Sequence, residues 1–319
     1  MTQPTQPDVA DAAYDLDQIR RACQAHGLAA AEIVALPQLG VSNVLYLVDG
    51  RYCLRLPGPM DWARWSIHIE ATGVPLAAAA GVSTPRLVAG DLSGELVDAP
   101  FLIYEWRPGR PLSDVPTHDP AVRPVFVSLG RDLARLHTSE LPASTLPARP
   151  GLDPRELLER SASAGVLNPT NAAWLRAALT SLEAAGGAWA EPKVMVHGDV
   201  HPANVLMSEQ PGDDGAYHYQ ALLDWGDLSQ GDPRSDLVDV PLRAVNAVLE
   251  GYQQEAGVDL DSWRAAVLWS HLDGALRYLS NAPSHVPHWG FPPGGRVFEM
   301  IAFYSSGEAD GWPRLPLPD

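Results

Sequence analysis

The spacing of apolar residues divides this chain into a strand-rich first third and a helix-rich remainder. Near the start, apolar residues recur at helical intervals and stop at Gly27, a residue type that commonly follows a helix. Two apolar runs then flank the dipeptide Asp49-Gly50, a pattern typical of a β-hairpin. We expect helices over 15–26 and 62–80, and strands over 44–48, 51–56, 85–90 and 99–104.

Beyond residue 106 the apolar spacing is mostly helical. Apolar residues from Val125 to Leu136 recur at i, i+4, i+8 and i+11, which predicts a core helix. Residues 1–14 are rich in Pro, Gln and Thr and lack any periodicity, so they are predicted to be a disordered leader. Further amphipathic helices are expected over 154–161, 172–185, 241–257 and 262–280.

A polar loop between two apolar runs is the strongest chemical signal in the sequence. The run Val194–Val196 leads into His197-Gly198-Asp199, and Asn204 follows five residues after Asp199. A later apolar run, Ala221–Leu223, leads directly into Asp224. Each of the three oxygen-bearing side chains lies at a junction between an expected strand and a loop, so they can converge on a hard cation and a hydroxyl group. Phosphoryl transfer requires this set, with one Asp to accept a proton and an Asn and an Asp to hold Mg²⁺.

The spacing His-x-Asp-x-x-x-x-Asn, followed by Asp-x-Gly, is the protein-kinase signature, with Gly198 in place of Arg and Trp225 in place of Phe. With His201-Pro202 after the Asp, the chain most resembles the family of aminoglycoside phosphotransferases and choline kinases. The resemblance extends over most of the chain. It implies a bilobal α+β fold like that of protein kinases.

The resemblance also implies how the chain is divided. An N-terminal nucleotide-binding lobe over 15–106 would contain a small antiparallel sheet and one helix. A larger, mostly helical lobe over 107–319 would bind the acceptor and catalyse the reaction. The Gly-Asp-Pro and Asp-Leu steps after the second motif also fit the family. We expect Asp232 to form a turn there and Asp236 to cap a helix.

The motif residues take their expected roles from the same resemblance. Asp199 would orient the acceptor hydroxyl and take its proton. Asn204 and Asp224 would hold Mg²⁺ on the phosphates of ATP or GTP. His197 would be a buried orienting residue, and His201 would contact the substrate or the backbone.

The nucleotide is expected to bind to the N-terminal lobe. Arg55 stands where the family places a Lys, and it would reach the phosphates while paired with Glu70. A planar guanidinium suits phosphate, although its reach differs from that of Lys. Cys53 lies on the same strand face as Arg55 and would touch the base. The other expected contacts come from the turn before the hairpin and from the hinge between the lobes: Gly40, Ser42, Asn43, Glu105, Trp106 and Arg107.

Composition limits the class of protein. A chain of 319 residues with 46% hydrophobic and 19% charged residues is typical of a soluble globular protein that buries a substantial core. No apolar run is long enough for a membrane span, and a basic stretch followed by an apolar one is missing at the start. The only cysteines are Cys23 and Cys53, so a disulfide framework is not indicated. We expect a cytoplasmic protein.

The formal net charge of −17 argues against nucleic acids and anionic membranes as partners, because both would be repelled. A cationic acceptor would be attracted to such a surface. The favoured explanation of the acidity is nevertheless solubility alone.

The expected activity is Mg²⁺-dependent transfer of the γ-phosphate of ATP or GTP to a hydroxyl group of a small molecule. An aminoglycoside-like antibiotic is the favoured acceptor, which would make the protein a resistance enzyme. A macrolide, an amino alcohol, a homoserine-like metabolite or a sugar remains an alternative. Two rival hypotheses are an inactive nucleotide-binding regulator and a zinc metallohydrolase with His197, Asp199 and His201 as ligands.

Overall fold

The computed structural model describes residues 14–37, 43–140, 146–149, 153–188, 194–280 and 295–315. They form two compact units, Met1–Pro108 with Ala221–Leu228 and Gly109–Gln220 with Ser229–Asp319. The border after residue 108 lies near the expected one. The segment Ala221–Leu228, however, was expected in the second lobe and packs within the first unit. The turn residues Gly40 and Ser42, and residues 1–13 of the predicted leader, lie outside the described residues.

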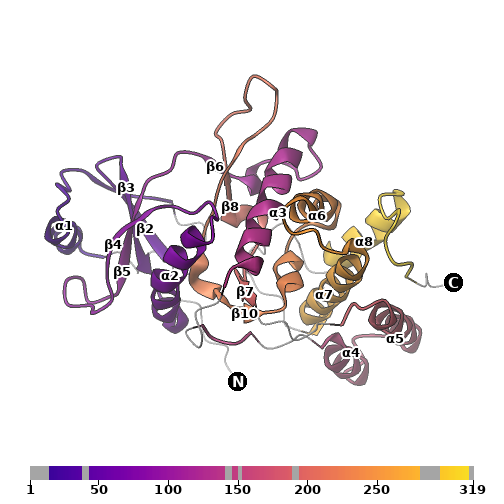
Figure 1. Cartoon of the computed structure of the whole chain (residues 1–319). Helices are drawn as coiled ribbons and strands as arrows, with labels where there is room; N and C mark the ends of the chain where they lie inside the picture. The colour runs from indigo at the N-terminus through magenta and orange to yellow at the C-terminus, as the bar shows by residue number, and fades with distance from the viewer. Residues whose placement is uncertain are drawn as a thin grey trace. The chain divides into compact units, whose positions relative to one another are not determined.

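The described strands of the first unit form one antiparallel sheet in the order β1-β2-β3-β5-β4, with a helix on each face (Figure 1). The sheet and the two helices match the α+β class expected from the sequence. The elements are α1 (Leu16–Ala25), β1 (Ile33–Ala35), β2 (Asn43–Val48), β3 (Tyr52–Pro57), α2 (Asp61–Ala79), β4 (Leu87–Asp91), β5 (Phe101–Glu105) and the short 3₁₀ helix η5 (Trp225–Asp227).

Side chains alternate between the two faces of β3, as its sequence predicts. Leu54 and Leu56 are buried in a core that they share with Ile19 and Cys23 of α1. Arg55 points to the opposite face, where its guanidinium contacts a carboxylate of α2. The face of β3 that carries polar groups is therefore the one covered by α2.

The second unit is mostly helical, with short strands that frame the His-Gly-Asp motif. Strand β7 pairs with β10, and β8 lies between β6 and β9. The strands are β6 (Arg110–Pro111), β7 (Val194–Val196), β8 (Val205–Met207), β9 (Tyr219–Leu222) and β10 (Ser229–Gly231). The helices are α3 (Arg123–Thr138), α4 (Pro154–Ser163), α5 (Pro169–Ala184), α6 (Leu242–Ala256), α7 (Leu260–Ser280) and α8 (Gly295–Ser305). The 3₁₀ helices are η2 (Leu112–Asp114), η3 (Pro120–Val122), η4 (Pro202–Asn204) and η6 (Pro233–Leu237).

Two glycines bring α3 and α6 into backbone contact (Figure 1). A Cβ atom added to Gly130 would lie 2.0 Å from the carbonyl oxygen of Val248, and one added to Gly251 would lie 1.9 Å from that of Val127. Only a hydrogen atom fits at either position, so this crossing requires glycine in both helices. The close approach matters because α3 and α6 each supply one side chain to the polar network described below.

Among the described residues, every helix falls short of the length and apolarity that a bilayer span requires.

Candidate active site

The His-Gly-Asp loop, residues 197–204, connects β7 to β8. It ends in the 3₁₀ turn η4, for which His201 is the N-terminal capping residue. Gly198 has a φ of +89°, in the left-handed region that side chains disfavour. Glycine at this position lets the chain turn sharply between the end of β7 and Asp199.

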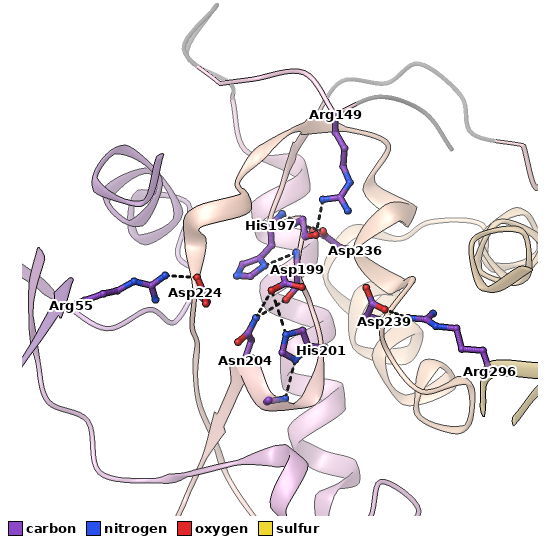
Figure 2. Close-up of polar contacts among 12 residues, drawn as sticks. Arg55, Arg149, His197, Asp199, His201, Asn204, Asp224, Asp236, Asp239 and Arg296 are labelled. Atoms are coloured by element: carbon purple, nitrogen blue, oxygen red, sulfur yellow. Dashed lines mark hydrogen bonds and ion pairs between the residues drawn. The ribbon is translucent and has the colours of Figure 1, made fainter. Parts of the chain in front are cut away.

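The Asp199 carboxylate is held at one of its two oxygens (Figure 2). Nδ2 of Asn204 lies 3.1 Å from Oδ2 of Asp199, and Nε2 of His201 lies 3.4 Å from the same atom. Nδ2 of Asn204 also donates to the Asp199 carbonyl at 2.9 Å. In the described part of the chain, Oδ1 receives no such contact, so it is the oxygen available to accept a proton.

The two histidines of the loop are buried and bind backbone groups. Nδ1 of His197 accepts the Asp199 N–H at 3.2 Å, and Nδ1 of His201 accepts the Ala203 N–H at 3.2 Å. These contacts assign the hydrogen of each neutral ring to Nε2. Among the described residues, no three His, Cys, Asp or Glu side chains are grouped as metal ligands. The zinc hypothesis requires His197, Asp199 and His201 to converge on one ion, and the described residues form no such group.

Asp199 remains about one third exposed, with 34% of its side-chain surface accessible. Burial of the remainder would raise the pKa of this carboxyl group. The interaction with His201, the electrostatic effect of His197 and the hydrogen bond from the Asn204 amide outweigh burial and lower the pKa below its ordinary value. Asp199 is therefore ionised at neutral pH, as a general base must be.

Asp236 anchors the loop from the second unit's buried interior. Its Oδ2 accepts the N–H of His197 at 2.8 Å, and its Oδ1 accepts the N–H of Gly198 at 2.8 Å. Nε2 of His137, on α3, lies 3.0 Å from Oδ2, and Nδ1 of the same ring lies 3.1 Å from the Tyr252 hydroxyl on α6. The prediction that Asp236 caps a helix was wrong, because its partners are backbone groups 38 and 39 residues away.

Its neighbour Asp232 does form the expected turn, since its side chain accepts the Arg234 N–H at the start of η6.

The charge on Asp236 is stabilised despite complete burial. Burial alone would raise the pKa of this carboxyl group. The hydrogen bond and electrostatic effect of His137, the electrostatic effect of His197 and the Gly198 N–H lower the pKa below its ordinary value instead. Because this buried anion accepts hydrogen bonds from the N–H groups of His197 and Gly198, it holds the backbone just before Asp199 in one conformation.

A second polar cluster lies within the first unit. Nη2 of Arg55 lies 2.9 Å from Oε2 of Glu70 and 2.5 Å from Oδ1 of Asp224. The Tyr104 hydroxyl donates to Oε1 of Glu70 at 2.7 Å. Burial raises the pKa of Glu70 to about 7, against the opposing effect of Arg55. The structure thus brings Arg55 and Glu70 together, the pair that the resemblance implied, and adds Asp224 to the same cluster.

Asp224 is placed by direct packing of η5 on α2. A Cβ atom on Gly226 would lie 1.7 Å from Oγ of Ser66, so the Asp-x-Gly motif needs glycine to approach this helix. Asp224 itself has a φ of +63°, an uncommon backbone conformation for a residue with a side chain. Such strain is often retained where it serves function. The resemblance placed this segment in the larger lobe, and its contact with α2, far upstream in the chain, leaves no signal in the sequence.

Two backbone N–H groups of the expected hinge are already hydrogen-bonded within the first unit. The N–H of Glu105 donates to the Arg86 carbonyl, and the N–H of Trp106 donates to the Arg51 carbonyl, at 2.9 and 2.8 Å. These two donors are therefore engaged before any nucleotide binds. Arg107, the third hinge residue, follows on the exposed surface.

The remaining nucleotide-binding candidates lie on β2 and β3. Burial raises the pKa of the Cys53 thiol to about 12, so it stays protonated and offers an uncharged surface to a base. Asn43 begins β2, and its Oδ1 is buried with no hydrogen-bond partner in the described part of the chain. Gly40 and Ser42 of the preceding turn are not among the described residues.

Asp236→Asn tests the anchor of the loop. The substitution removes a buried charge and turns an NH₂ group toward a backbone N–H, so we expect a loss of unfolding free energy on the order of 3 kcal/mol. Amide hydrogen exchange at His197 and Gly198 should also accelerate. Urea unfolding and exchange would be compared with Asp213→Asn, a substitution of an exposed carboxylate. Equal stability of the two variants would contradict the role of Asp236.

Comparisons with known proteins identify the family of this chain. A family model described as the phosphotransferase enzyme family matches residues 32–266, which is more than half of the chain. The matched region includes both the His-Gly-Asp loop and the cluster around Arg55. A search of curated proteins gives no match.

Several solved structures have the same fold. The macrolide 2′-phosphotransferase MphH from Brachybacterium faecium is 20% identical, with a TM-score of 0.57, and the match covers 96% of this chain and 99% of that one. The GDP complex of aminoglycoside 2′-phosphotransferase-IIIa is 16% identical, with a TM-score of 0.64 and coverage of 91% and 97%. A spectinomycin phosphotransferase bound to ADP and spectinomycin is 14% identical, with a TM-score of 0.56 and coverage of 95% of both chains.

At these identities the structural likeness establishes the fold, and it confirms the kinase-like α+β class expected from the sequence. The family match confirms the resemblance to aminoglycoside phosphotransferases and the enzyme class. This chain belongs to the phosphotransferase enzyme family.

Proposed function

We propose that this protein transfers the γ-phosphate of ATP or GTP to a hydroxyl group of a small molecule, with an aminoglycoside-like antibiotic as the favoured acceptor. The observation that supports this most strongly is the state of Asp199. Its carboxylate is ionised, partly exposed and held at Oδ2 by Asn204 and His201. A carboxylate with one oxygen held and the other open is suited to orient a hydroxyl group and take its proton.

Each proposed Mg²⁺ ligand offers the oxygen atoms that this ion prefers. Because Nδ2 of Asn204 is directed at Asp199, Oδ1 of the same amide faces away from that carboxylate. Asp224 is a carboxylate with 25% of its side-chain surface exposed. We assign Asn204 and Asp224 as the residues that would hold the ion. When bound, Mg²⁺ would neutralise charge on the nucleotide phosphates.

Arg55 is proposed to bind the phosphates. Its neighbours Glu70 and Asp224 hold the guanidinium in place. Burial would lower the pKa of Arg55, but the two carboxylates raise it, so the side chain stays charged. A planar guanidinium can donate two parallel hydrogen bonds to a phosphate, which a Lys ammonium cannot. Glu70 would act through Arg55 rather than on the nucleotide.

The acceptor class is supported by the similar structures and by charge. The similar proteins include macrolide, aminoglycoside and spectinomycin phosphotransferases, and one of them is described as a complex with kanamycin. A net charge of −17 would favour the approach of a cationic acceptor such as an aminoglycoside. A macrolide is the second candidate, because the match to the macrolide enzyme extends over nearly the whole of both chains.

A screen of hydroxylated antibiotics and metabolites for phosphate transfer tests the proposal. With Mg²⁺ and ATP or GTP, we expect stoichiometric transfer of phosphate to at least one acceptor. The transfer can be monitored by ³¹P NMR. The nucleotide with Mg²⁺ should also raise Tm, because a ligand at a hundred times its Kd stabilises the native state by about 2.7 kcal/mol. Asp224→Asn should reduce that rise.

Two outcomes would contradict the proposal. Tightly bound stoichiometric zinc without any response to nucleotide would favour the hydrolase hypothesis. A normal rise in Tm with no transfer to any acceptor would favour an inactive nucleotide-binding regulator.

Substitutions at Arg55 test the phosphate contact. Arg55→Ala should raise the KM for nucleotide and lower kcat, since a charge-assisted hydrogen bond is worth about 1.5–3 kcal/mol, or roughly tenfold to a hundredfold. Arg55→Lys should keep much of the activity, and Glu70→Gln should cause a smaller loss. Arg51→Ala, at an exposed position on the same hairpin, is the control. Unchanged kinetics in Arg55→Ala with a loss in Arg51→Ala would transfer the role to Arg51.

A further inference from the structure

Residues 147–149 are hydrogen-bonded to β10, which pairs with the strand before the His-Gly-Asp loop. The N–H of Arg149 donates to the Gln230 carbonyl at 2.8 Å, and the N–H of Gln230 donates to the Pro147 carbonyl at 2.9 Å. Ala148 and Gln230 form a parallel bridge. Because Gln230 belongs to β10 and β10 pairs with β7, the backbone of Arg149 is held against β10, one strand away from the strand that leads into the loop.

The side chain of Arg149 reaches the loop itself (Figure 2). Nη1 donates to the carbonyl oxygen of Gly198 at 2.6 Å. The aliphatic part of the side chain lies over Gly231, where an added Cβ atom would be 3.5 Å from Cβ of Arg149. In the described part of the chain, no carboxylate forms an ion pair with this guanidinium. Its hydrogen bond to the Gly198 carbonyl is therefore its main polar contact with the loop.

The Gly198 carbonyl belongs to the peptide plane that precedes Asp199. The N–H of that plane, contributed by Asp199, donates to Nδ1 of His197 at 3.2 Å. The N–H of Gly198, one plane earlier, donates to Asp236. A peptide plane is rigid, so contacts at both its oxygen and its N–H set the direction in which the Asp199 side chain leaves the backbone.

Glycine makes this contact necessary. Gly198 has no Cβ atom, so its sterics do little to prevent rotation of the plane about ψ of Gly198 and φ of Asp199. Rotation would turn the carbonyl away from Arg149 and move Asp199 with it. A misplacement of about 1 Å in a catalytic group can cost on the order of a hundredfold in rate.

We propose that Arg149 is a positioning residue for phosphoryl transfer, which holds the Gly198–Asp199 peptide plane and thereby orients the proposed base. The inference rests on the proposed function of Asp199. Arg149 acts through the backbone and not through nucleotide or acceptor, so its loss lowers kcat and leaves the KM values nearly unchanged. The requirement is for a donor at the Gly198 carbonyl, which Lys meets in part.

Arg149→Met removes the donor and keeps the aliphatic stem over Gly231. It should lower kcat about tenfold to a hundredfold, with nucleotide and acceptor KM within about twofold of wild type. Arg149→Lys should lie between the two, and added guanidinium ion should restore part of the activity of Arg149→Met. Arg160→Ala, at an exposed arginine of α4, is the matched control and should behave as wild type.

Amide hydrogen exchange in residues 194–207 supplies a measurement that needs no acceptor. Exchange at Asp199 should be faster in Arg149→Met than in wild type and unchanged in Arg160→Ala. If the wild-type protein transfers no phosphate but exchange at Asp199 is still faster in Arg149→Met, the proposed function is overturned and the loop contact is supported. Unchanged exchange, or a raised KM with normal kcat, would overturn the role of Arg149. If Arg149→Met does not fold, the same comparisons made with Arg149→Lys decide between these outcomes.

Discussion

The buried carboxylate of Asp236 is the interaction on which the second unit's site depends. It accepts hydrogen bonds from His197 and Gly198 in the loop, and it contacts His137 of α3. Removing any one donor would leave a buried anion less compensated, which is costly in a protein interior. The glycine contact between α3 and α6 also serves this network, because His137 and Tyr252 come from those two helices. The geometry of the loop therefore depends on the packing of α3 against α6.

The first unit has a different electrostatic arrangement. Arg55 is a single cation between two carboxylates, Glu70 and Asp224, in a buried cluster. The cluster has an excess of negative charge when both acids are ionised. Burial, together with the charge of Asp224, raises the pKa of Glu70 to about 7. A divalent cation near Asp224 would supply the missing positive charge. The proposed Mg²⁺ would thus complement a cluster that the fold leaves acidic.

Local patterns predicted most of the elements, because apolar periodicity depends on neighbours in sequence. The helix expected over 62–80 is Asp61–Ala79, and the hairpin strands differ from prediction by a residue or so. Strand β1 was missed because three residues give no periodicity, and α8 because its start lacks a capping signal. The roles of Asp236 and the docking of Gly226 on α2 depend on contacts between distant segments. No spacing in the sequence encodes such contacts.

The most direct measurement of the central claim is the turnover of Asp199→Asn with an acceptor found by the screen, at saturating Mg²⁺ and nucleotide. Asn keeps the size of the side chain and an oxygen for Asn204 and His201, but it cannot take a proton at neutral pH. We predict a fall in kcat of about 10²–10⁴-fold, with nucleotide binding and Tm close to wild type. Turnover near the wild-type value in this variant would contradict the assignment of Asp199 as the base.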